Sequence, residues 1–277
     1  MMENLQLVIC DIDNTLVSAH THEMQPYTKE VIRKLHAHGI HFGLASGRPL
    51  DEIEAQVKRW GLQEETTLLL GLNGCQLWDG NHKRLDSYYL LETAWIKEIL
   101  ELMEPFDLNP YMYLDGGRFL ATRMDEMVQY SANKVGKKII LVDDTREFYK
   151  EKNAKLMFRI AEDKMPEIEA YVKQHESNHY KAFKTQTTML EFANRNVSKA
   201  FAMKEYCKHN DIAVQDVMAF GDMSNDNDML EASGLGVCLL NGSDDTKAIA
   251  DMITEKTCDE EGFAHFIEQY VFTPRGW

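Results

Sequence analysis

Short apolar runs alternate with amphipathic stretches along the first part of the chain. The apolar runs are at residues 5–10, 41–46 and 67–71, and the stretches with helical spacing between them are at residues 28–38 and 50–60. This alternation predicts a parallel sheet with crossover helices on both faces. It returns from Lys199 to the end of the chain, where a closing helix is expected at residues 260–270.

The rhythm changes after Asn73-Gly74. Residues 76–85 have the pattern of a hairpin-like strand and turn, and the elements that follow lack the regular alternation. The middle of the chain is therefore predicted to be an α+β cap at residues 82–189, inserted into a discontinuous α/β core at residues 1–81 and 190–277. The expected cap helices are 92–106, 124–135 and 166–175, and the expected strands are 110–114, 118–122, 138–142, 155–160, 180–184 and 188–193.

Composition restricts the kind of ligand. With 44% apolar and 10% aromatic residues in 277, the chain can bury well-packed cores. Its formal net charge of −15 opposes nonspecific binding of nucleic acid. An anionic substrate would therefore have to meet locally placed cations or a metal ion.

Cysteine usage and the N-terminal sequence indicate the compartment. An odd number of dispersed cysteines with no C-x-x-C pair suggests neither a disulfide framework nor a zinc ribbon. The first residues become charged too soon for a signal peptide, and no apolar stretch approaches the roughly 20 residues that span a bilayer. We therefore expect a soluble, cytoplasmic protein without a membrane partner. The cysteines are Cys10, Cys75, Cys207, Cys238 and Cys258.

Polar side chains directly follow three of the predicted strands. Asp11 and Asp13 follow the first, Ser46 the second, and Asp222 the strand at 217–221. Ligands of open α/β sheets bind beyond the carboxyl ends of the strands, so these residues can meet in space. A carboxylate such as Asp11 can attack phosphorus, and Asp13 could carry protons to and from the reacting oxygens. Alternatively, these aspartates only end a strand and begin a turn.

The segment GDMSNDND, from Gly221, is rich in oxygen ligands. Mg²⁺ prefers hard oxygen donors and retains waters, which suits Asp11 together with Asp222. An EF-hand loop is excluded because Asn227 and Ser233 occupy the places of its glycine and bidentate glutamate. A polar loop that caps a helix is the plainer alternative.

Two further residues could bind phosphoryl oxygens. Lys199 begins a predicted helix, where a cation opposes the helix dipole, so helix stability does not explain it. The alternatives are a surface lysine and, for Ser46, a cap on the helix near Pro49. His20 and His22 are expected to be ordinary loop histidines because no third transition-metal ligand is apparent.

Four segments in this order, DIDNTL, ASGR, VSK and GDMSNDND, resemble the motifs of the haloacid dehalogenase (HAD) superfamily. The likeness is greatest to its Cof-like phosphatases, which insert a large cap into a Rossmann-like core. It implies a Mg²⁺ ion held by Asp11, Asp222 and the main-chain carbonyl of Asp13, and a supporting role for Thr15. Asn14 stands where the family commonly has glycine. The resemblance further implies that Ser46, Gly47, Arg48, Asn73 and Asn225 bind substrate or phosphate and that Asp226 supports the metal or Lys199.

The resulting hypothesis is Mg²⁺-dependent hydrolysis of a small phosphate monoester through an aspartyl-phosphate. The resemblance points to sugar phosphates or phosphorylated cofactors as substrates, with the cap selecting among them. Two alternatives remain open: a phosphosugar mutase, which a bisphosphosugar requirement would reveal, and a non-catalytic regulator that binds a phosphorylated metabolite. The sequence does not indicate an oligomeric state.

Overall fold

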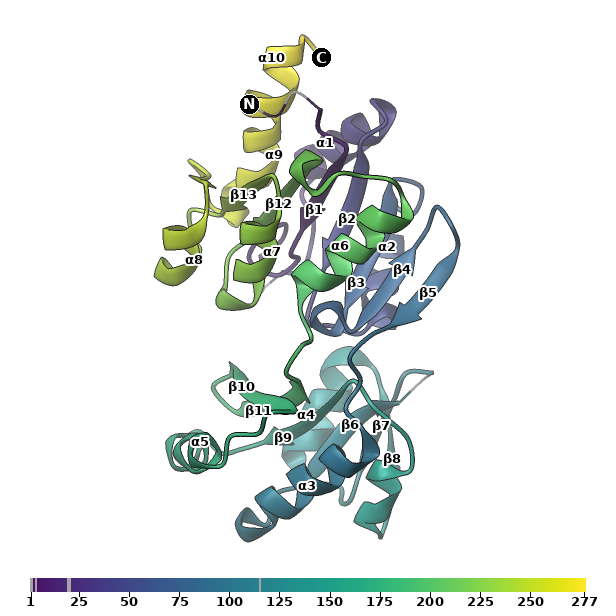
Figure 1. Cartoon of the computed structure of the whole chain (residues 1–277), viewed down its shortest axis with the longest axis vertical. Coiled ribbons are helices and arrows are strands. Elements are labelled where there is room, and N and C mark those ends of the chain that lie inside the picture. The colour runs from purple at the N-terminus through teal and green to yellow at the C-terminus, as the bar shows by residue number, and fades with distance from the viewer. Residues whose placement is uncertain (1, 3, 19–20, 115) are drawn as a thin grey trace. The chain divides into compact units, whose positions relative to one another are not determined.

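A computed structural model describes residues 2, 4–18, 21–114 and 116–277, so His20 lies outside the described residues. The chain divides into two compact units (Figure 1). The core unit comprises Met1–Tyr88 and Ser198–Trp277, and the inserted unit comprises Tyr89–Val197. Each unit has its own sheet and its own apolar cores.

The division differs in detail from the expected boundaries at 81/82 and 189/190. The first expected boundary falls in the turn between β4 (Gln76–Asp79) and β5 (Arg84–Ser87), which pair within the core sheet. The second falls inside β11 (Met189–Asn194), a strand of the inserted unit. A polar turn between two strands has the same composition as a polar linker between domains, so composition alone placed the break too early.

In the described part of the chain the core sheet has eight strands, in the order β14-β13-β12-β1-β2-β3-β4-β5. All pairings from β14 to β3 are parallel, which confirms the predicted α/β core. β4 and β5 run antiparallel and form one edge. The remaining bounds are β1 Leu7–Cys10, β2 His41–Ala45, β3 Thr66–Gly71, β12 Val217–Gly221, β13 Leu235–Cys238 and β14 Met252–Ile253.

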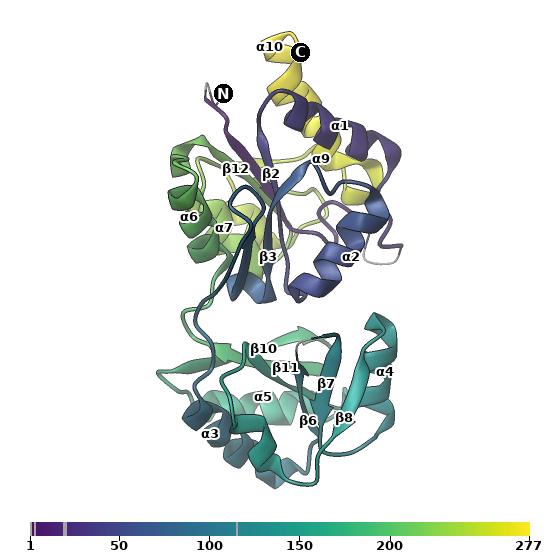
Figure 2. The same ribbon diagram turned by 90° about the vertical axis from the view of Figure 1, so that its right-hand side faces the viewer.

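Helices cover both faces of the core sheet (Figure 2). Alternate strand residues face opposite sides, so Val8 and Cys10 pack in one apolar cluster and Leu7 and Ile9 in another. The first cluster includes α1 (Pro26–Ala37), α2 (Leu50–Trp60) and α9 (Gly262–Ile267). The second includes α6 (Lys199–His209) and α7 (Asn227–Ala232). The π-helical turn Glu268–Phe272 adds Val271 and Phe272 to the first cluster, and Ile249 of α8 (Asp244–Ile249) packs against the second. The short helix α10 (Thr273–Arg275) follows the π-helical turn.

The inserted unit is an α+β layer structure, as predicted. Among its described residues the sheet has six strands, in the order β10-β11-β9-β6-β7-β8. Apolar residues of α3 and α5 pack on one face of this sheet, and those of α4 pack on the other. The bounds are α3 Thr93–Met103, β6 Pro110–Leu114, β7 Arg118–Ala121, α4 Glu126–Val135, β8 Lys138–Leu141, β9 Lys155–Arg159, α5 Met165–Gln174 and β10 Tyr180–Gln186.

Short 3₁₀ turns join many of these elements, at Leu72–Gly74, Glu104–Phe106, Thr145–Tyr149, Val214–Asp216, Ser224–Asp226 and Cys258–Glu260. All five cysteines lie among the described residues and are buried, and none of them forms a disulfide. Within the described residues, no helix combines the length and the apolar character needed to cross a membrane.

Sheet register brings the three predicted strand ends together. Cys10 of β1 lies opposite Leu44 of β2 and Phe220 of β12. Asp11 directly follows Cys10. Ser46 lies two residues after Leu44, and Asp222 lies two residues after Phe220. The carboxyl ends of parallel strands lie at one edge of a sheet, so the sheet carries all three side chains to one place.

The loop after β3 depends on a glycine. Gly74 has φ +90°, and a Cβ added there would lie 2.2 Å from the Ser198 carbonyl oxygen at the start of α6. We predict that Gly74→Ala lowers the free energy of unfolding by about 1–3 kcal/mol more than Gly39→Ala does. Gly39 is the matched control because its φ is +75° but no atom lies within 4 Å of the added Cβ. Urea unfolding of both variants measures the difference, and equal losses would contradict the steric account.

Candidate active site

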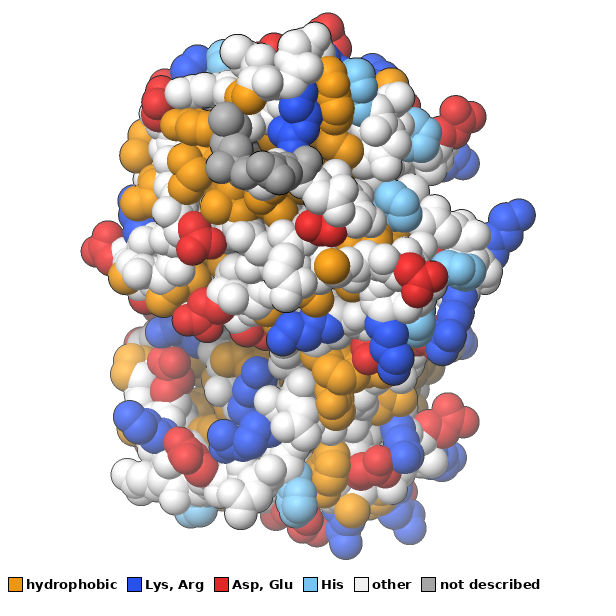
Figure 3. Space-filling model, turned by 45° about the horizontal axis from the view of Figure 1, so that its top comes forward, with side chains coloured by type: hydrophobic (Ala, Val, Ile, Leu, Met, Phe, Trp, Pro, Cys, Tyr) orange, Lys and Arg blue, Asp and Glu red, His pale blue; other side chains and the backbone are white. Residues whose placement is uncertain are grey.

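Four buried charged residues of the core unit lie close together. Acidic and basic side chains are both visible over the face of the molecule drawn in Figure 3, where water solvates them. Asp11, Lys199, Asp222 and Asp226 are instead at most 7% exposed. Burial of charge is costly unless the charges are paired and hydrogen-bonded, so the partners of these four groups define what the site can do.

Lys199 joins two carboxylates from different parts of the fold. Its Nζ donates to Asp11 Oδ1 at 2.6 Å and to Asp226 Oδ1 at 2.5 Å. Burial disfavours the ammonium, but the two carboxylates outweigh burial and raise the pKa of Lys199 above its ordinary value. The surface alternative for Lys199 is therefore wrong. The ammonium is held at the start of α6, which Ser198 caps by accepting a hydrogen bond from the Phe201 N–H.

Asp226 is fully used by the protein itself. Its Oδ1 accepts from Lys199, and its Oδ2 accepts from the backbone N–H groups of Asp222 and Met223, at 3.0 and 3.2 Å. Close approach is possible because residue 221 is glycine, where an added Cβ would lie 2.4 Å from Asp226 Cβ. Asp226 thus fixes both the ammonium and the backbone that carries Asp222.

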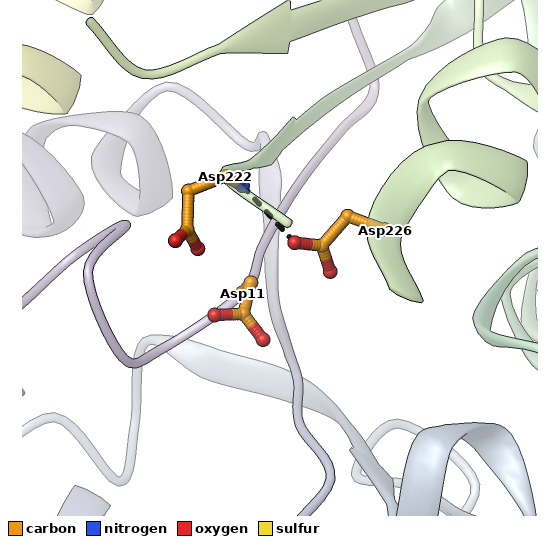
Figure 4. A group of neighbouring side chains, drawn as sticks. All are labelled: Asp11, Asp222 and Asp226. Atoms are coloured by element: carbon orange, nitrogen blue, oxygen red, sulfur yellow. Dashed lines mark hydrogen bonds between the residues drawn. The ribbon is translucent and has the colours of Figure 1, made fainter. Parts of the chain in front are cut away.

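Asp222 lies beside Asp11 and Asp226. One oxygen from each of the three carboxylates lies within 4.8 Å of the others (Figure 4), and Thr15 Oγ1 donates to Asp222 Oδ1 at 2.9 Å. Burial, followed by repulsion from Asp226, raises the pKa of Asp222 to about 7. Burial likewise raises the pKa of Asp11 well above its ordinary value, although Lys199 opposes this effect. Both carboxyls thus lack sufficient positive charge nearby.

This shortage of positive charge fits a divalent cation. When ionised, the three carboxylates carry three negative charges and Lys199 carries one positive charge, which leaves two negative charges uncompensated. Since both oxygens of Asp226 are already bonded, Asp11 and Asp222 are the carboxylates able to hold a metal ion. Oxygen donors alone suit a hard cation such as Mg²⁺.

Asp13 has a different environment from Asp11. Its side chain is 30% exposed and forms a bidentate pair with Arg48, from Nε to Oδ2 at 2.9 Å and from Nη2 to Oδ1 at 2.7 Å. His22 Nδ1 lies 3.1 Å from Asp13 Oδ1 and 3.3 Å from the same Arg48 nitrogen. Arg48 therefore forms an ion pair. Its partner, Asp13, lies in the DIDNTL segment next to Asp11 and not on a distant part of the surface.

The other predicted phosphate-binding residues form a connected group. Ser46 Oγ accepts from the Arg48 N–H at 3.2 Å, and Ser46 O accepts from the Asn73 N–H at 2.9 Å. Asn225 Nδ2 donates to Asn73 Oδ1 at 3.3 Å. A Cβ added at Gly47 would lie 3.4 Å from the same Asn73 oxygen. Ser46 does not cap α2, whose N-cap is Pro49, so the capping alternative is wrong.

Several residues that support the site were not predicted from the sequence. Gly221 is required by the position of Asp226, and its place directly before an aspartate at a strand end was the available signal. His22 contacts Asp13, although it was expected to be an ordinary loop histidine. α8 and the side chains of Asn227 and Thr246 support the loop, with Thr246 Oγ1 donating to Asn227 Oδ1 at 2.7 Å. No local pattern in the sequence links these two distant residues.

Comparison with known proteins gives a consistent result. A family model described as haloacid dehalogenase-like hydrolase matches residues 8–267. The chain is 23% identical over 272 residues to 5-amino-6-(5-phospho-D-ribitylamino)uracil phosphatase YitU of Bacillus subtilis, covering 95% of this chain and 97% of that protein. It is 24% identical over 272 residues to an HMP-PP phosphatase of Yersinia enterocolitica, covering 97% and 96%.

The fold has close structural counterparts. One is a haloacid dehalogenase-like hydrolase from Bacteroides thetaiotaomicron, with a TM-score of 0.84 and 24% identity. The similarity covers 96% of this chain and 99% of that one. Both units therefore occur together in a known architecture.

The raised pKa of Asp222 makes a prediction about pH. In the folded, metal-free protein the pKa of Asp222 is about 7, whereas the ordinary value is 3.8. The folded protein therefore keeps this proton to a higher pH than the unfolded chain does. As pH rises from about 4 to about 7, this group lowers the free energy of unfolding by at most about 1.4 kcal/mol per pH unit. We therefore predict that Asp222→Asn, whose amide oxygen still accepts from Thr15, is more stable than the parent in EDTA at pH 8.

Urea unfolding of both proteins across this pH range tests the prediction. The difference between them isolates residue 222 because the rest of the charge is common to both. The advantage of the variant should vanish near pH 4, and added Mg²⁺ should stabilise the parent more than the variant. If the free energies of unfolding of the parent and the variant changed in parallel with pH, Asp222 would not be the source of the loss of stability.

Proposed function

The chain belongs to the haloacid dehalogenase-like hydrolases, and from this membership we propose that it is a Mg²⁺-dependent phosphatase of small phosphate monoesters. The resemblance inferred from the four segments is confirmed by the family match over residues 8–267. One observation carries the proposal: Asp11 lies at a strand end with a fixed ammonium at 2.6 Å and a second carboxylate, Asp222, beside it. A nucleophilic carboxylate, a fixed cation and a second carboxylate that can hold a metal ion are the groups used in phosphoryl transfer to a carboxylate.

In the proposed mechanism Asp11 is the nucleophile. Lys199 occupies its Oδ1, which leaves Oδ2 to attack phosphorus. The new bond joins Asp11 to phosphorus while the ester P–O bond breaks, and Asp13 gives a proton to the departing oxygen. Water then attacks the phosphorus of the aspartyl-phosphate, Asp13 takes up a proton from that water, and inorganic phosphate leaves with Asp11 restored.

Asp13 has to part from Arg48 before it can carry a proton. Both oxygens of Asp13 accept hydrogen bonds from the Arg48 guanidinium, so neither oxygen is available to a substrate or a water while the pair is intact. Both side chains are partly exposed, and water can solvate them when they separate. We assign Arg48 and its neighbour Ser46 to substrate or phosphate binding, with Gly47, Asn73 and Asn225 on the adjoining loops.

The metal ion would be held by Asp11 and Asp222, with the main-chain carbonyl of Asp13 as the third ligand that family membership implies. When bound, it reduces the repulsion between the anionic nucleophile and the phosphate dianion. Asp226 and Thr15 hold these ligands in position. Asp226 accepts hydrogen bonds from the backbone N–H groups of residues 222 and 223, and Thr15 donates one to the Asp222 side chain.

The substrate class follows from relatives that span nearly the whole chain. Their names describe a phosphatase of a phosphoribityl compound and a phosphatase of HMP-PP. We therefore assign the chain to small phosphorylated metabolites, with sugar phosphates and phosphorylated cofactors as the first to test. The residues of the core site address the phosphoryl group that all such substrates share, so selection among leaving groups is assigned to the inserted unit.

Turnover in the presence and absence of metal tests the function. We predict that purified protein hydrolyses p-nitrophenyl phosphate and members of a sugar-phosphate and cofactor panel with Mg²⁺, that EDTA abolishes turnover, and that Ca²⁺ restores little. The larger and more variable coordination shell of Ca²⁺ aligns an in-line displacement less well. Phosphate release is the measurement. Full activity in metal-free buffer, or no turnover of any ester, would contradict the proposal.

Two variants serve as internal controls for that experiment. Asp11→Asn removes the nucleophile and should form no phosphoenzyme. Asp13→Asn removes the proton carrier and should turn over poorly, yet it should form some phosphoenzyme from p-nitrophenyl phosphate because that leaving group needs little protonation. Hydroxylamine-sensitive label on Asp11→Asn at this site would show that another residue is the nucleophile.

Lys199 permits a test that separates catalysis from folding. We predict that Lys199→Met lowers kcat by on the order of 10²-fold or more, because a fixed charge stabiliser is lost. The same change leaves Asp11 and Asp226 buried without their cation, which should lower the free energy of unfolding by about 3–5 kcal/mol. This loss of stability differs from what is expected for a surface lysine.

Adding Asp226→Asn to Lys199→Met is the matched control. The Asn amide oxygen can still accept from the N–H groups of residues 222 and 223, while one uncompensated charge disappears. Part of the stability should return, measured by urea unfolding, and kcat should stay low. Recovery of kcat together with stability would assign Lys199 a purely structural role.

A further inference from the structure

Arg159 is a buried cation of the inserted unit. It lies on β9, between β11 and β6 in the sheet (Figure 1). Successive residues of a strand face opposite sides of a sheet. Phe158 packs in the apolar cluster of α3 and α5, so Arg159 faces the other side, where α4 packs. Only 7% of Arg159 is exposed, and a guanidinium stays charged in proteins.

Among the described residues, Arg159 forms hydrogen bonds only with neutral side chains. Its Nε donates to Ser131 Oγ at 2.8 Å, and its Nη1 donates to Gln186 Oε1 and Thr188 Oγ1, both at 2.9 Å. These contacts leave Nη2 for a further acceptor. The nearby Tyr111 hydroxyl is also uncharged, because burial raises the pKa of Tyr111 to about 12. None of these groups compensates the charge of the guanidinium.

A buried carboxylate on the same face of the sheet has another partner. Glu191 of β11 lies opposite Met157, which is two residues before Arg159. Its Oε2 accepts from Lys155 Nζ at 2.8 Å, and its Oε1 accepts from Thr185 Oγ1 at 3.1 Å. Lys155 and Glu191 are both buried and neutralise each other. No carboxylate of the described residues forms an ion pair with Arg159, so its charge lacks a counter-ion there.

The surroundings of Arg159 open to solution beside the turn between β10 and β11. Gln186 is exposed, Thr188 is half-buried, and Tyr130, whose ring centre lies 5.6 Å from Arg159 Cζ, is 60% exposed. A charge removed from water is costly without an opposite charge, and the planar fork of a guanidinium matches the oxygens of a phosphate or carboxylate. The Gln186 amide nitrogen and the Thr188 hydroxyl hydrogen can donate to the same anion while their oxygens accept from Arg159.

We propose that Arg159, Gln186 and Thr188 form an oxyanion site on the inserted unit, which binds a phosphate or carboxylate group through Arg159 Nη2. The group belongs either to a free oxyanion or to a substrate that carries a second anionic group. The first source does not depend on the phosphatase proposal, whereas the second rests on it. Two measurements distinguish these sources.

Thermal unfolding of the full chain in EDTA tests binding of a free oxyanion. About 50 mM phosphate should raise the midpoint of the parent by about 2–4 °C relative to chloride of the same ionic strength. Arg159→Gln, which removes the cation, should lose most of this gain. Gln186→Glu replaces the amide beside Nη1 by a carboxylate of the same shape, so it should raise the midpoint in chloride and also lose most of the phosphate gain.

Two features of this design keep it decisive. Residue 186 is exposed, so Gln186→Glu provides the test even if Arg159→Gln does not fold. Gln174→Glu is the matched control, because it makes the same change at an exposed position of α5, which packs on the other face of the sheet. It should keep the phosphate gain of the parent, which separates binding at Arg159 from the general effect of phosphate on protein stability.

Turnover with Mg²⁺ tests the second source. If the group belongs to the substrate, Gln186→Glu should lower kcat/KM for glucose 1,6-bisphosphate at least about tenfold and for p-nitrophenyl phosphate by less than about twofold. A phosphate gain without this discrimination assigns the site to a free oxyanion. Absence of turnover for every ester would contradict the phosphatase proposal alone, since thermal unfolding does not require turnover. An equal phosphate gain in the parent and in Gln186→Glu, with no discrimination between the two esters, would overturn the oxyanion site.

Discussion

The buried ion pairs of Lys199 are the interaction on which the rest of the site depends. A charge removed from water is tolerated only when opposite charge lies close to it. Lys199 meets this condition for Asp11, at the end of β1, and for Asp226, in the loop after β12. These segments are far apart in the sequence, so the ammonium fixes their relative positions. Any chemistry at Asp11 begins from a carboxylate whose place and charge Lys199 sets.

The constraint extends from Lys199 into the backbone. Because one oxygen of Asp226 is held by the ammonium, the other is positioned to accept from two backbone N–H groups at residues 222 and 223. This contact needs a residue without Cβ at 221, which explains the glycine at the end of β12. Asp222 is then presented to Asp11 by a rigid loop rather than by its own side-chain preferences. Burial and repulsion raise its pKa, and a bound cation would relieve both effects.

The sequence contained the reacting groups but only part of their arrangement. Apolar runs that end in Asp11, Ser46 and Asp222 predict a parallel sheet with these residues at one edge, because strand direction and register follow from local patterns. The sequence could not show that β5 belongs to the core sheet, since a turn and a linker have similar compositions. Nor could it show that Arg48 pairs with Asp13, because a long side chain has many possible partners and only the folded loops select one.

The two aspartates of the first motif have counter-ions of opposite character, and this difference suits their proposed tasks. The Lys199 side chain is fully buried beside Asp11, so separating that pair would leave charge without water or a partner. Arg48 and Asp13 are 25% and 30% exposed, and water can replace each partner when they separate. A nucleophile needs a fixed position from which to attack, whereas a proton carrier must gain and lose a proton in each turnover. The buried pair therefore suits attack at phosphorus, and the exchangeable pair suits proton transfer.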